Sequence, residues 1–540
     1  MTWFERAARS PAGMAAVAAV LAAATHACGP PGGDEAAHLY LTAFWREHGW
    51  LAWDNLWYSG RYALVNYSLA YHPLAALAGP VAVTAASAGL AAWGFAVLVR
   101  RRWPLAGPWP AAAFALLTPL AVVAGTYPFT LGLAFALVAL VAAGAGRPWA
   151  GLAAAGAAMA ASPLALVFLL LAAAAAVAAR PARAHTRAGA ITAAGLGALV
   201  VAQLVSMRAF PAPSARYPFD PKDAAAIAVF CAAGLAMTWR APAARDLRAF
   251  FGVYAAATAG SLVVPTGVGG NMVRVTLVAG LPLMLVAASF AGRRLLPAAA
   301  VACAAALVWQ LIPAWTGGRA AEEARAPNAA FWAPVEAYWS AHGDPAHRAH
   351  VVATADNWEA WHVARRGIPL TRGWFRQDDF PVNDTLYDDP LAAGAYLTWL
   401  RDVAAKYVFL PDDPRDYTGQ REARLLATGA LPEVARLPGW TVYAVPGAAP
   451  IATPTPAARV VRVTSAHVVV RVSRAGTYRL RMRYSPYLVA GPGTCVSPRE
   501  PWGVDLRVDA PGTVDVAFDP TPRRVWDVLR GRHTACPPRL

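Results

Sequence analysis

Residues 128–146 read PFTLGLAFALVALVAAGAG and contain no charged side chain. A membrane-spanning helix needs about 20 largely apolar residues, so this stretch predicts a helix that crosses a lipid bilayer. Comparable apolar blocks recur between Met14 and Trp315. Of the 540 residues, 57% are hydrophobic and 14% are charged, whereas ordinary globular chains carry about 25% charged residues. The pattern predicts a polytopic α-helical membrane protein and argues against a water-soluble enzyme.

The apolar blocks predict about eleven spans, given the length that a bilayer requires. Two blocks are ambiguous. The block at 149–161 is short, so Pro163 either separates two helices or kinks a single long one. The block at 69–99 is long for one crossing, and we expect it to begin outside the hydrocarbon. The expected spans are residues 11–28, 69–99, 107–125, 128–146, 149–161, 163–179, 188–206, 224–238, 249–264, 272–291 and 295–314.

The formal net charge of +16 comes almost entirely from arginine, because only Lys222 and Lys406 among the 47 basic residues are lysines. Many arginines form short clusters between apolar blocks, which is typical of cytoplasmic membrane loops and excludes a nucleic-acid partner. With eleven spans and a cytoplasmic N-terminus, every strong cluster falls on the cytoplasmic side. We therefore expect a plasma-membrane protein whose chain after Trp315 is extracellular. The clusters are Arg100–Arg102, Arg147, and those within 180–187, 240–248 and 293–294.

Three domains are expected. Residues 1–315 form a transmembrane domain whose first external loop is 29–68. We expect the first apolar block to remain as a helix, although its basic start and the small residues before Cys28 also fit a signal peptide. Residues 316–446 mix helical and strand patterns, as a small external α/β domain does. After a Pro/Ala/Thr-rich linker, residues 459–540 alternate apolar and polar positions between Gly/Pro turns, which predicts an external β-sandwich.

Four of the five cysteines fall into two groups, and Cys28 lies at the outer end of the first predicted span. Cys231 and Cys303 lie inside predicted spans, where a free cysteine behaves as a small apolar side chain. Cys495 and Cys536 both lie in the predicted external β-sandwich, on the oxidising side of the membrane. We expect these two to form a disulfide, since no matching cysteine or histidine pair accompanies them for metal binding.

The first external loop concentrates polar and aromatic residues. It begins with the acidic pair Asp34-Glu35 directly after the first span and continues with a helical pattern over 35–47. An interfacial helix with an aromatic belt accounts for its tryptophans and tyrosines. That reading leaves the acidic pair unexplained, because two neighbouring carboxylates at a membrane surface are unfavourable without a partner.

The acidic pair after the first span, the interfacial helix, ten to thirteen spans and a C-terminal external domain resemble the GT-C superfamily of integral-membrane glycosyltransferases. Residues 57–62 (WYSGRY) and 71–74 (YHPL) are similar to a loop of a bacterial subgroup described as YfhO-like or 6-pyruvoyl-tetrahydropterin-synthase-related membrane proteins. Residues 373–379 and 440–443 resemble the external domain of that subgroup. The resemblance covers the architecture of most of residues 1–446 and depends on short motifs.

The resemblance implies transfer of a sugar from a polyprenyl-phosphate donor to an envelope glycan or lipid acceptor on the outer face. It implies that Asp34, with Glu35 as the second candidate, is the general base or a ligand of a divalent metal such as Mg or Mn. A base within hydrogen-bond reach of the acceptor hydroxyl fits this chemistry. Asp34 also fits a structural role, as a carboxylate near the positive N-terminus of the following helix.

The departing lipid phosphate needs a cation. Arg274 is the first candidate, because it follows the glycine-rich segment 265–271 at the outer start of a span. A helix start of this kind favours anion binding, although an arginine there can also extend toward lipid headgroups. Further candidates are Arg61, Arg216 and Lys222. The resemblance and the polar character of the first loop add a substrate loop, with His38, Tyr58, Arg61, Tyr71 and His72.

Two other classes of protein remain open from the sequence. A lipid or glycan transporter would carry buried charges within its spans and paired repeats, and the spans are almost empty of ionisable residues. A non-catalytic envelope assembly protein would bind glycans through its external domains. In the external domain of this chain, we expect the acidic run from Asp378 to Asp389 to be a solvated loop. Contact with an acceptor glycan is the alternative.

Overall fold

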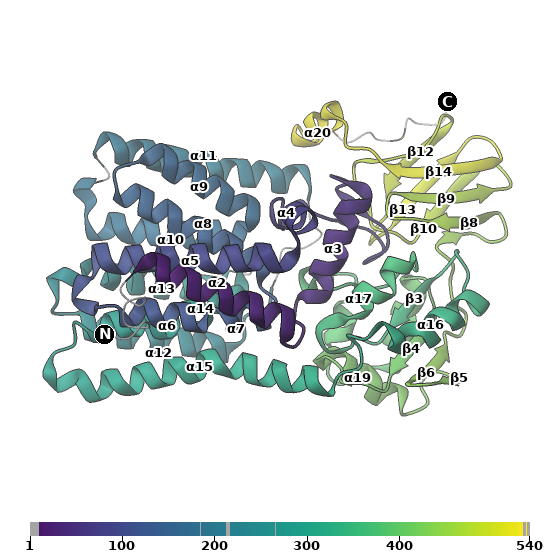
Figure 1. Ribbon diagram of the computed structural model, residues 1–540. Helices are drawn as coiled ribbons and strands as arrows, with labels where there is room; N and C mark the ends of the chain where they lie inside the picture. The colour runs from purple at the N-terminus through teal and green to yellow at the C-terminus, as the bar shows by residue number, and fades with distance from the viewer. Residues whose placement is uncertain (1–9, 184, 212–216, 265, 533–535, 537–540) are drawn as a thin grey trace. The chain divides into compact units, whose positions relative to one another are not determined.

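The computed structural model describes residues 10–183, 185–211, 217–264, 266–532 and 536. The chain divides into two compact units. The first, which we call the helical unit, comprises Met1–Asp34, Asn66–Leu204 and Ala215–Glu322. The second, the C-terminal unit, comprises Glu35–Val65, Val205–Ser214 and Glu323–Leu540. The chain therefore leaves the helical unit after Asp34 and returns to it at Asn66 (Figure 1).

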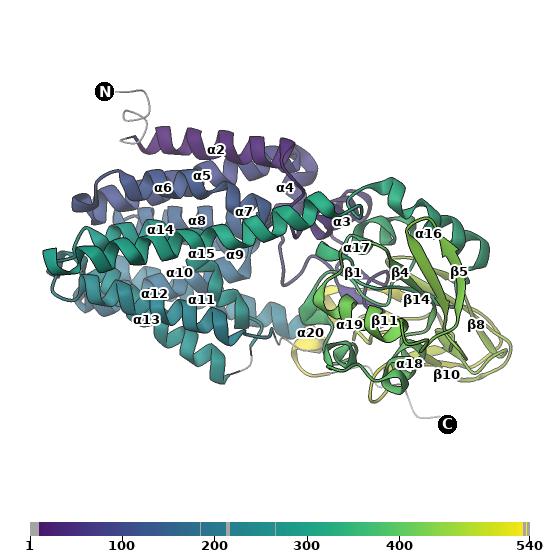
Figure 2. The same cartoon turned by 90° about the horizontal axis from the view of Figure 1, so that it is seen from below.

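The helical unit is built from apolar helices, several of which begin with proline at the first turn, where its missing N–H costs no hydrogen bond. In both Figure 1 and Figure 2 its long helices lie roughly along a common direction. The helices are α2 (Pro11–Cys28), α4 (Tyr71–Ala78), α5 (Pro80–Arg102), α6 (Trp109–Leu117), α7 (Pro119–Val123), α8 (Tyr127–Gly144), α9 (Pro148–Ala161), α10 (Pro163–Ala179), α11 (Arg187–Ala209), α12 (Pro221–Thr238), α13 (Arg245–Val263), α14 (Arg274–Ala288) and α15 (Leu296–Glu323).

Among the described residues, seven helices are long and apolar enough to cross a membrane: Pro11–Cys28, Pro80–Arg102, Tyr127–Gly144, Arg187–Ala209, Pro221–Thr238, Gly269–Ala288 and Arg293–Glu323. Three shorter apolar helices accompany them, Trp109–Val123, Pro148–Ala161 and Pro163–Ala179. The two ambiguous blocks are both resolved as pairs. Pro163 starts a new helix after the extended residue Ser162, and the block at 69–99 divides at Gly79, whose φ of +87° ends α4.

Small residues let the helices of this unit approach closely. A Cβ on Gly132 of α8 would lie 2.6 Å from Cβ of Ala165 on α10, and one on Gly94 of α5 would lie 2.8 Å from Cβ of Leu137 on α8. Close backbone approach of this kind is typical of helices that pack within a bilayer, where apolar burial alone provides little association energy.

Basic residues gather at one end of the helical unit. Nη1 of Arg102, at the end of α5, lies 3.4 Å from Oδ2 of Asp246, and Nη2 of Arg180, just after α10, lies 3.0 Å from the same oxygen. The guanidinium of Arg102 also lies beside Gly144, the last residue of α8. The basic residues therefore gather at the end of the helical unit where α8 ends, at Gly144.

The C-terminal unit begins with an α/β part. Its four strands are ordered β3-β4-β6-β5, with β3 (Arg348–Val351) parallel to β4 (Ala405–Pro411). β6 (Trp440–Ala444) and β5 (Glu433–Leu437) continue the sheet antiparallel. Its helical elements include α16 (Ala329–His342), α17 (Glu359–His362), η9 (Asp384–Tyr387), α18 (Ala393–Asp402) and α19 (Tyr417–Leu426).

Two further four-stranded sheets form a β-sandwich, in the orders β12-β13-β10-β7 and β11-β14-β9-β8. In β9 the buried Val470 and Val472 stand on either side of the exposed Arg471, as expected of a half-buried strand. The strands are β7 (Ala452–Thr453), β8 (Ala458–Val463), β9 (His467–Val472), β10 (Gly476–Leu480), β11 (Leu488–Val489), β12 (Thr494–Pro498), β13 (Val504–Val508) and β14 (Gly512–Phe518), followed by helix α20 (Pro522–Leu529). A disulfide joins Cys495 of β12 to Cys536.

Most of the first loop belongs to the C-terminal unit. It forms α3 (Glu35–His48), β1 (Trp53–Asp54) and β2 (Arg61–Tyr62). Trp53 stacks on Phe518 of the β-sandwich with ring centroids 5.5 Å apart, and the indole of Trp57 donates to the carbonyl of Ala360 at 3.0 Å. Both indoles are buried inside this unit. The expectation of an interfacial aromatic belt is therefore wrong for these two, because each ring finds protein partners instead.

Candidate functional site

Asp34 is fixed at the end of the segment that follows α2. The peptide N–H of Gly33 donates to the carbonyl of Val123 at 3.0 Å. Gly125, in the turn between α7 and α8, has φ +69°, and a Cβ there would lie 2.4 Å from the nitrogen and 2.9 Å from Cα of Asp34. A glycine is therefore required at this approach. Asp34 is half-buried, and its backbone is held at the N-terminal end of α8.

Aromatic and histidine rings surround this end of α8. His26 of α2 stacks on Tyr127 with ring centroids 4.8 Å apart, and its Nδ1 lies 3.2 Å from Oγ1 of Thr84. Tyr71 lies next to Tyr127, with centroids 6.0 Å apart, and next to His72 at 5.3 Å. Tyr71 and His72 are both fully buried. Two residues of the expected substrate loop are thus brought to the helix end that holds Asp34.

Arg274 lies at the same helix end. It is the first residue of α14, and its guanidinium carbon is 5.3 Å from the ring centroid of Phe129, the third residue of α8. Its Nε donates to Oδ1 of Asn271 at 2.9 Å. An acid and an arginine, 240 positions apart in the chain, are therefore both held against the first turn of α8 or the turn that precedes it.

Two loops of the helical unit meet beside Arg274. The N–H of Tyr217 donates to the carbonyl of Thr266 at 3.1 Å, and a Cβ on Gly269 would lie 2.0 Å from the carbonyl oxygen of Tyr217. Lys222 follows in the first turn of α12, where its N–H donates to the Asp220 cap at 2.8 Å. This contact brings the segments that carry Lys222 and Arg274 together. Arg216, the remaining predicted cation of this loop, lies outside the described residues.

Arg61 has a different environment, inside the C-terminal unit. Its Nε lies 2.7 Å from Oδ2 of Asp378, and its guanidinium is 4.0 Å above the ring of Phe375. The preceding Tyr58 and Ser59 have φ of 56° and 61°, a conformation that costs about 1–3 kcal/mol for each such residue. Nε of Arg483 donates to the carbonyl of Tyr58 at 3.1 Å, which helps to hold this turn.

The other predicted residues of the first loop also lie in the C-terminal unit. Glu35 is the first residue of α3 and is half-buried. His38 is buried on the same helix, with its ring 6.4 Å from that of Trp374. Burial raises the pKa of Tyr58 well above its ordinary value, and the carboxylate of Asp379 adds to this shift. The predicted residues are thus divided between the two units, and the boundary falls between Asp34 and Glu35.

The expectation of a solvated acidic run is wrong for Asp378 and Asp379, which are 9% and 0% exposed. Arg372 binds both oxygens of Asp379, at 3.0 and 2.7 Å, and Asn383 and Tyr387 donate to it as well. Burial opposes the ionisation of Asp379, but these partners hold its pKa below the ordinary value. The sequence analysis missed this pairing, for which Arg372, seven positions before Asp379, was the available signal; Arg376 pairs with Asp416 instead.

A divalent metal is not supported by the arrangement of these side chains. Among the described residues, no group of three or more His, Cys, Asp or Glu side chains lies close enough to hold a metal ion. Asp34 and Glu35 alone do not make up such a set, so no chemical step below passes through a metal.

Comparisons with known proteins give a likeness to solved structures. No family model matches the chain, and no curated protein matches it. Among solved structures, it is similar to a mutant form of the arabinofuranosyltransferase AftD from mycobacteria, with a TM-score of 0.46 and 18% sequence identity. The match covers 81% of this chain and 41% of the AftD chain. The chain therefore spans less than half the length of that protein.

Proposed function

We propose that the protein is an integral-membrane glycosyltransferase that moves a sugar from a polyprenyl-phosphate donor to an envelope glycan or lipid acceptor at the outer face. One observation carries the proposal: Asp34 and Arg274 are both held at the N-terminal end of α8. This is the end of the helical unit away from the Arg102, Arg180 and Asp246 cluster. It therefore corresponds to the outer end if the arginine clusters are cytoplasmic.

The reaction needs one base and one cation. The acceptor oxygen attacks the anomeric carbon of the donor, and the bond from that carbon to the phosphate oxygen breaks. The hydroxyl proton passes to the Asp34 carboxylate, while polyprenyl phosphate leaves with the electron pair. Arg274, with Lys222 nearby in the fold, supplies the positive charge that stabilises the departing phosphate. Glu35 is the second candidate for the base, since it follows Asp34 directly.

The contacts around Asp34 fix the position of its backbone, as a catalytic base requires and a carboxylate on a mobile surface loop lacks. The Gly33–Val123 hydrogen bond and the close approach to Gly125 fix its backbone on one side. α3 begins at the next residue, and α3 belongs to the C-terminal unit. A base held in this way loses little conformational freedom when the acceptor binds, which is the condition for efficient general-base catalysis.

The proposal is tested by transfer assays on the purified full-length chain. Polyprenyl-phosphate-linked arabinose, mannose and glucose serve as donors, each labelled in the sugar, with neutral oligosaccharides as acceptors. We expect transfer from at least one donor, and a loss of about 100-fold to 10,000-fold in the Asp34→Asn variant. Glu35→Gln is the matched control, because it removes the neighbouring carboxylate and is expected to retain most of the activity.

Three other results would change the assignment of the base or of the function. Full activity in Asp34→Asn together with loss in Glu35→Gln would move the base to Glu35. Full activity in both variants would remove the general-base role from this segment. Absence of transfer from every donor would contradict the transferase function and favour a non-catalytic glycan-binding protein.

A further inference from the structure

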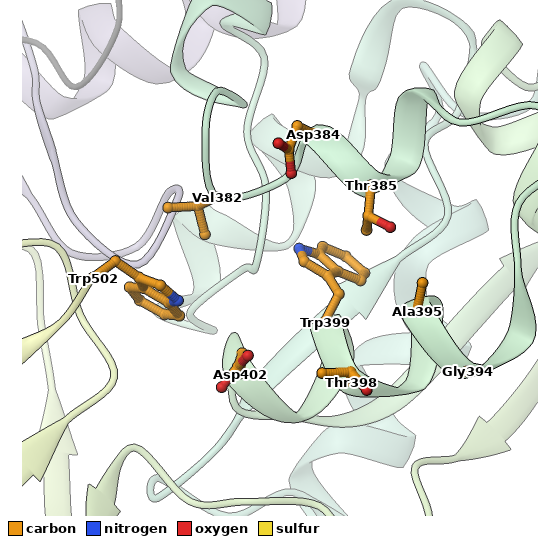
Figure 3. Close-up of a pocket in the computed structure, with 9 residues that line it drawn as sticks. All are labelled: Val382, Asp384, Thr385, Gly394, Ala395, Thr398, Trp399, Asp402 and Trp502. Atoms are coloured by element: carbon orange, nitrogen blue, oxygen red, sulfur yellow. The ribbon is translucent and has the colours of Figure 1, made fainter. Parts of the chain in front are cut away.

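A pocket of about 360 Å³ opens in the C-terminal unit between the α/β part and the β-sandwich. One wall comes from η9 and the residues before it, and a second from α18. The opposite side is formed by Trp502, from the loop between β12 and β13 of the sandwich (Figure 3). Ligand pockets commonly measure about 300–1,000 Å³, so the space suffices for a small organic group. The lining residues are Val382, Asp384, Thr385, Gly394, Ala395, Thr398, Trp399, Asp402 and Trp502.

The two indoles of the pocket are held in place. The indole N–H of Trp399 donates to Oδ1 of Asn383 at 3.0 Å, and Asn383 is itself bound to Asp379 at 3.0 Å. Trp502 is half-buried and packs against the hydrophobic core of the α/β part, although it belongs to the sandwich. Trp399 is 5% exposed, so Trp502 is the indole that offers a ring face to a ligand. A fixed aromatic ring presents a flat apolar surface at little entropic cost, and the C–H face of a sugar ring fits such a surface.

Hydrogen-bonding groups accompany these rings. Asp384 and Thr398 are exposed. The side chain of Asp402 is 43% exposed, and Nη2 of Arg479 lies 3.5 Å from one of its oxygens. Figure 3 shows Asp402 and Asp384 on different sides of the pocket, with the Trp399 ring between them. Ionised carboxylates accept strong hydrogen bonds from hydroxyl groups. The pocket therefore combines ring surfaces with acceptors for several hydroxyls.

The charge of the pocket separates one ligand class from others. Arg479 lies beside Asp402, but the lining itself holds two carboxylates and no basic residue. This charge disfavours the lipid-phosphate donor and acidic polymers as ligands. The two acids do not meet the requirement for a cation site, since no group of three metal-ligating side chains occurs among the described residues. A neutral molecule rich in hydroxyl groups matches both the ring and the carboxylates.

We propose that this pocket binds a neutral glycan, with a sugar unit against Trp502 and its hydroxyls donating to Asp384 and Asp402. The site goes beyond the proposed transferase function, because binding here involves neither Asp34 nor Arg274 and requires no turnover. A glycan held in the pocket contacts both the α/β part and the sandwich. The C-terminal unit would then retain an envelope polysaccharide independently of any chemistry in the helical unit.

The test is calorimetric titration of the full-length protein with neutral arabino-, manno- and gluco-oligosaccharides, and with an oligogalacturonide of equal length as the anionic control. We expect at least one neutral oligosaccharide to bind and the oligogalacturonide not to bind. The half-buried Trp502 is the residue to remove, because the deeply buried Trp399 also supports the core. Trp502→Ala is expected to weaken binding about tenfold, and Asp402→Asn by a similar factor.

Matched controls make the result specific. Trp526→Ala removes a tryptophan that is 54% exposed on α20, and it is expected to leave the affinity unchanged. Asp34→Asn is expected to keep the part of the binding that Trp502→Ala removes, which separates this site from the proposed catalytic one. The proposal is overturned if no neutral oligosaccharide binds, if Trp502→Ala binds unchanged, or if Asp34→Asn abolishes binding.

Discussion

Charged side chains lie in different places in the two units of the molecule. In the helical unit, Asp246 pairs with Arg102 and Arg180, and all three lie near helix ends. The C-terminal unit instead encloses the Arg372–Asp379 pair, whose side chains are 6% and 0% exposed. A membrane interior cannot hydrate an ion, so charge is moved to the ends of helices. The C-terminal unit keeps charge inside, where each ion depends on its partner.

The difference indicates how each unit obtains a specific packing. Close contacts at Gly94 and Gly132 set the helix–helix distances in the helical unit. In the C-terminal unit, polar networks link separate segments: Glu422 accepts from Tyr396 at 2.8 Å and lies 2.6 Å from Nε2 of His350. Substitutions of the same kind should therefore have different consequences in the two units.

The largest effect is expected from breaking the buried ion pair. Asp379→Ala leaves the Arg372 guanidinium buried without its counter-charge, and should lower the free energy of unfolding by about 3–5 kcal/mol. The measurement is thermal unfolding of the full chain, followed by tryptophan fluorescence. Glu433→Ala removes an acid from the exposed pair with Arg436 on β5 and should leave the midpoint unchanged. Equal shifts in the two variants would show that burial does not determine the contribution of these pairs.

A second effect concerns pH. Burial raises the pKa of Glu359 from its ordinary value of 4.5 to about 7, against the opposing hydrogen bonds from Thr354. The folded protein therefore retains this proton where the unfolded chain has lost it. The protonated acid makes its full contribution to the free energy of unfolding below pH 4.5, and this contribution is lost as the pH rises toward 7. This change amounts to about 3 kcal/mol.

Glu359→Gln tests that account, because the amide keeps the shape of the side chain and cannot ionise. As the pH rises from 4.5 to 7, the midpoint temperature of thermal unfolding should decrease more for the wild type than for the variant. Parallel pH profiles for the two proteins would contradict the raised pKa.

The smallest effect is expected in the helical unit. Gly132→Ala places a Cβ 2.6 Å from Cβ of Ala165 and should destabilise the unit by about 1–3 kcal/mol. Gly252→Ala on α13 is the matched control, since a Cβ there has no neighbour within 4 Å. The control should be neutral or slightly stabilising, as alanine favours a helix. A loss in Gly252→Ala as large as that in Gly132→Ala would indicate that close helix contacts do not determine packing here.

Local patterns in the sequence predicted much of the secondary structure. Alternation of apolar and polar residues predicts strands at 459–464, 467–473, 477–484, 503–508 and 513–518. The bounds of β8, β9, β13 and β14 agree with four of these segments to within one residue, whereas β10 covers only the first part of 477–484. The alternation of a half-buried strand and the apolar length of a span both depend on residues that are close together in the chain. Pro163 could be read in two ways, and the extended backbone of Ser162 shows that it starts a separate helix.

Tertiary partners could not be predicted in this way. The composition of residues 35–65 fits an interfacial loop as well as a buried one, and contacts of Trp53 with Phe518 decide between them. Asp379 looks solvated until Arg372 and Asn383 are placed around it. The closeness of Asp34 to the N-terminal end of α8 likewise depends on Gly125, 91 positions further along the chain.

The central claim is that Asp34 acts on the acceptor while Arg274 holds the donor phosphate. It is tested most directly by steady-state kinetics of sugar transfer, with the donor varied, for the wild type, Asp34→Asn and Arg274→Gln. We expect Asp34→Asn to lower kcat by about 100-fold or more with little change in the donor KM. Arg274→Gln should raise the donor KM by about tenfold, as loss of a charge-assisted contact does. An Asp34→Asn variant that keeps the wild-type kcat would contradict the account.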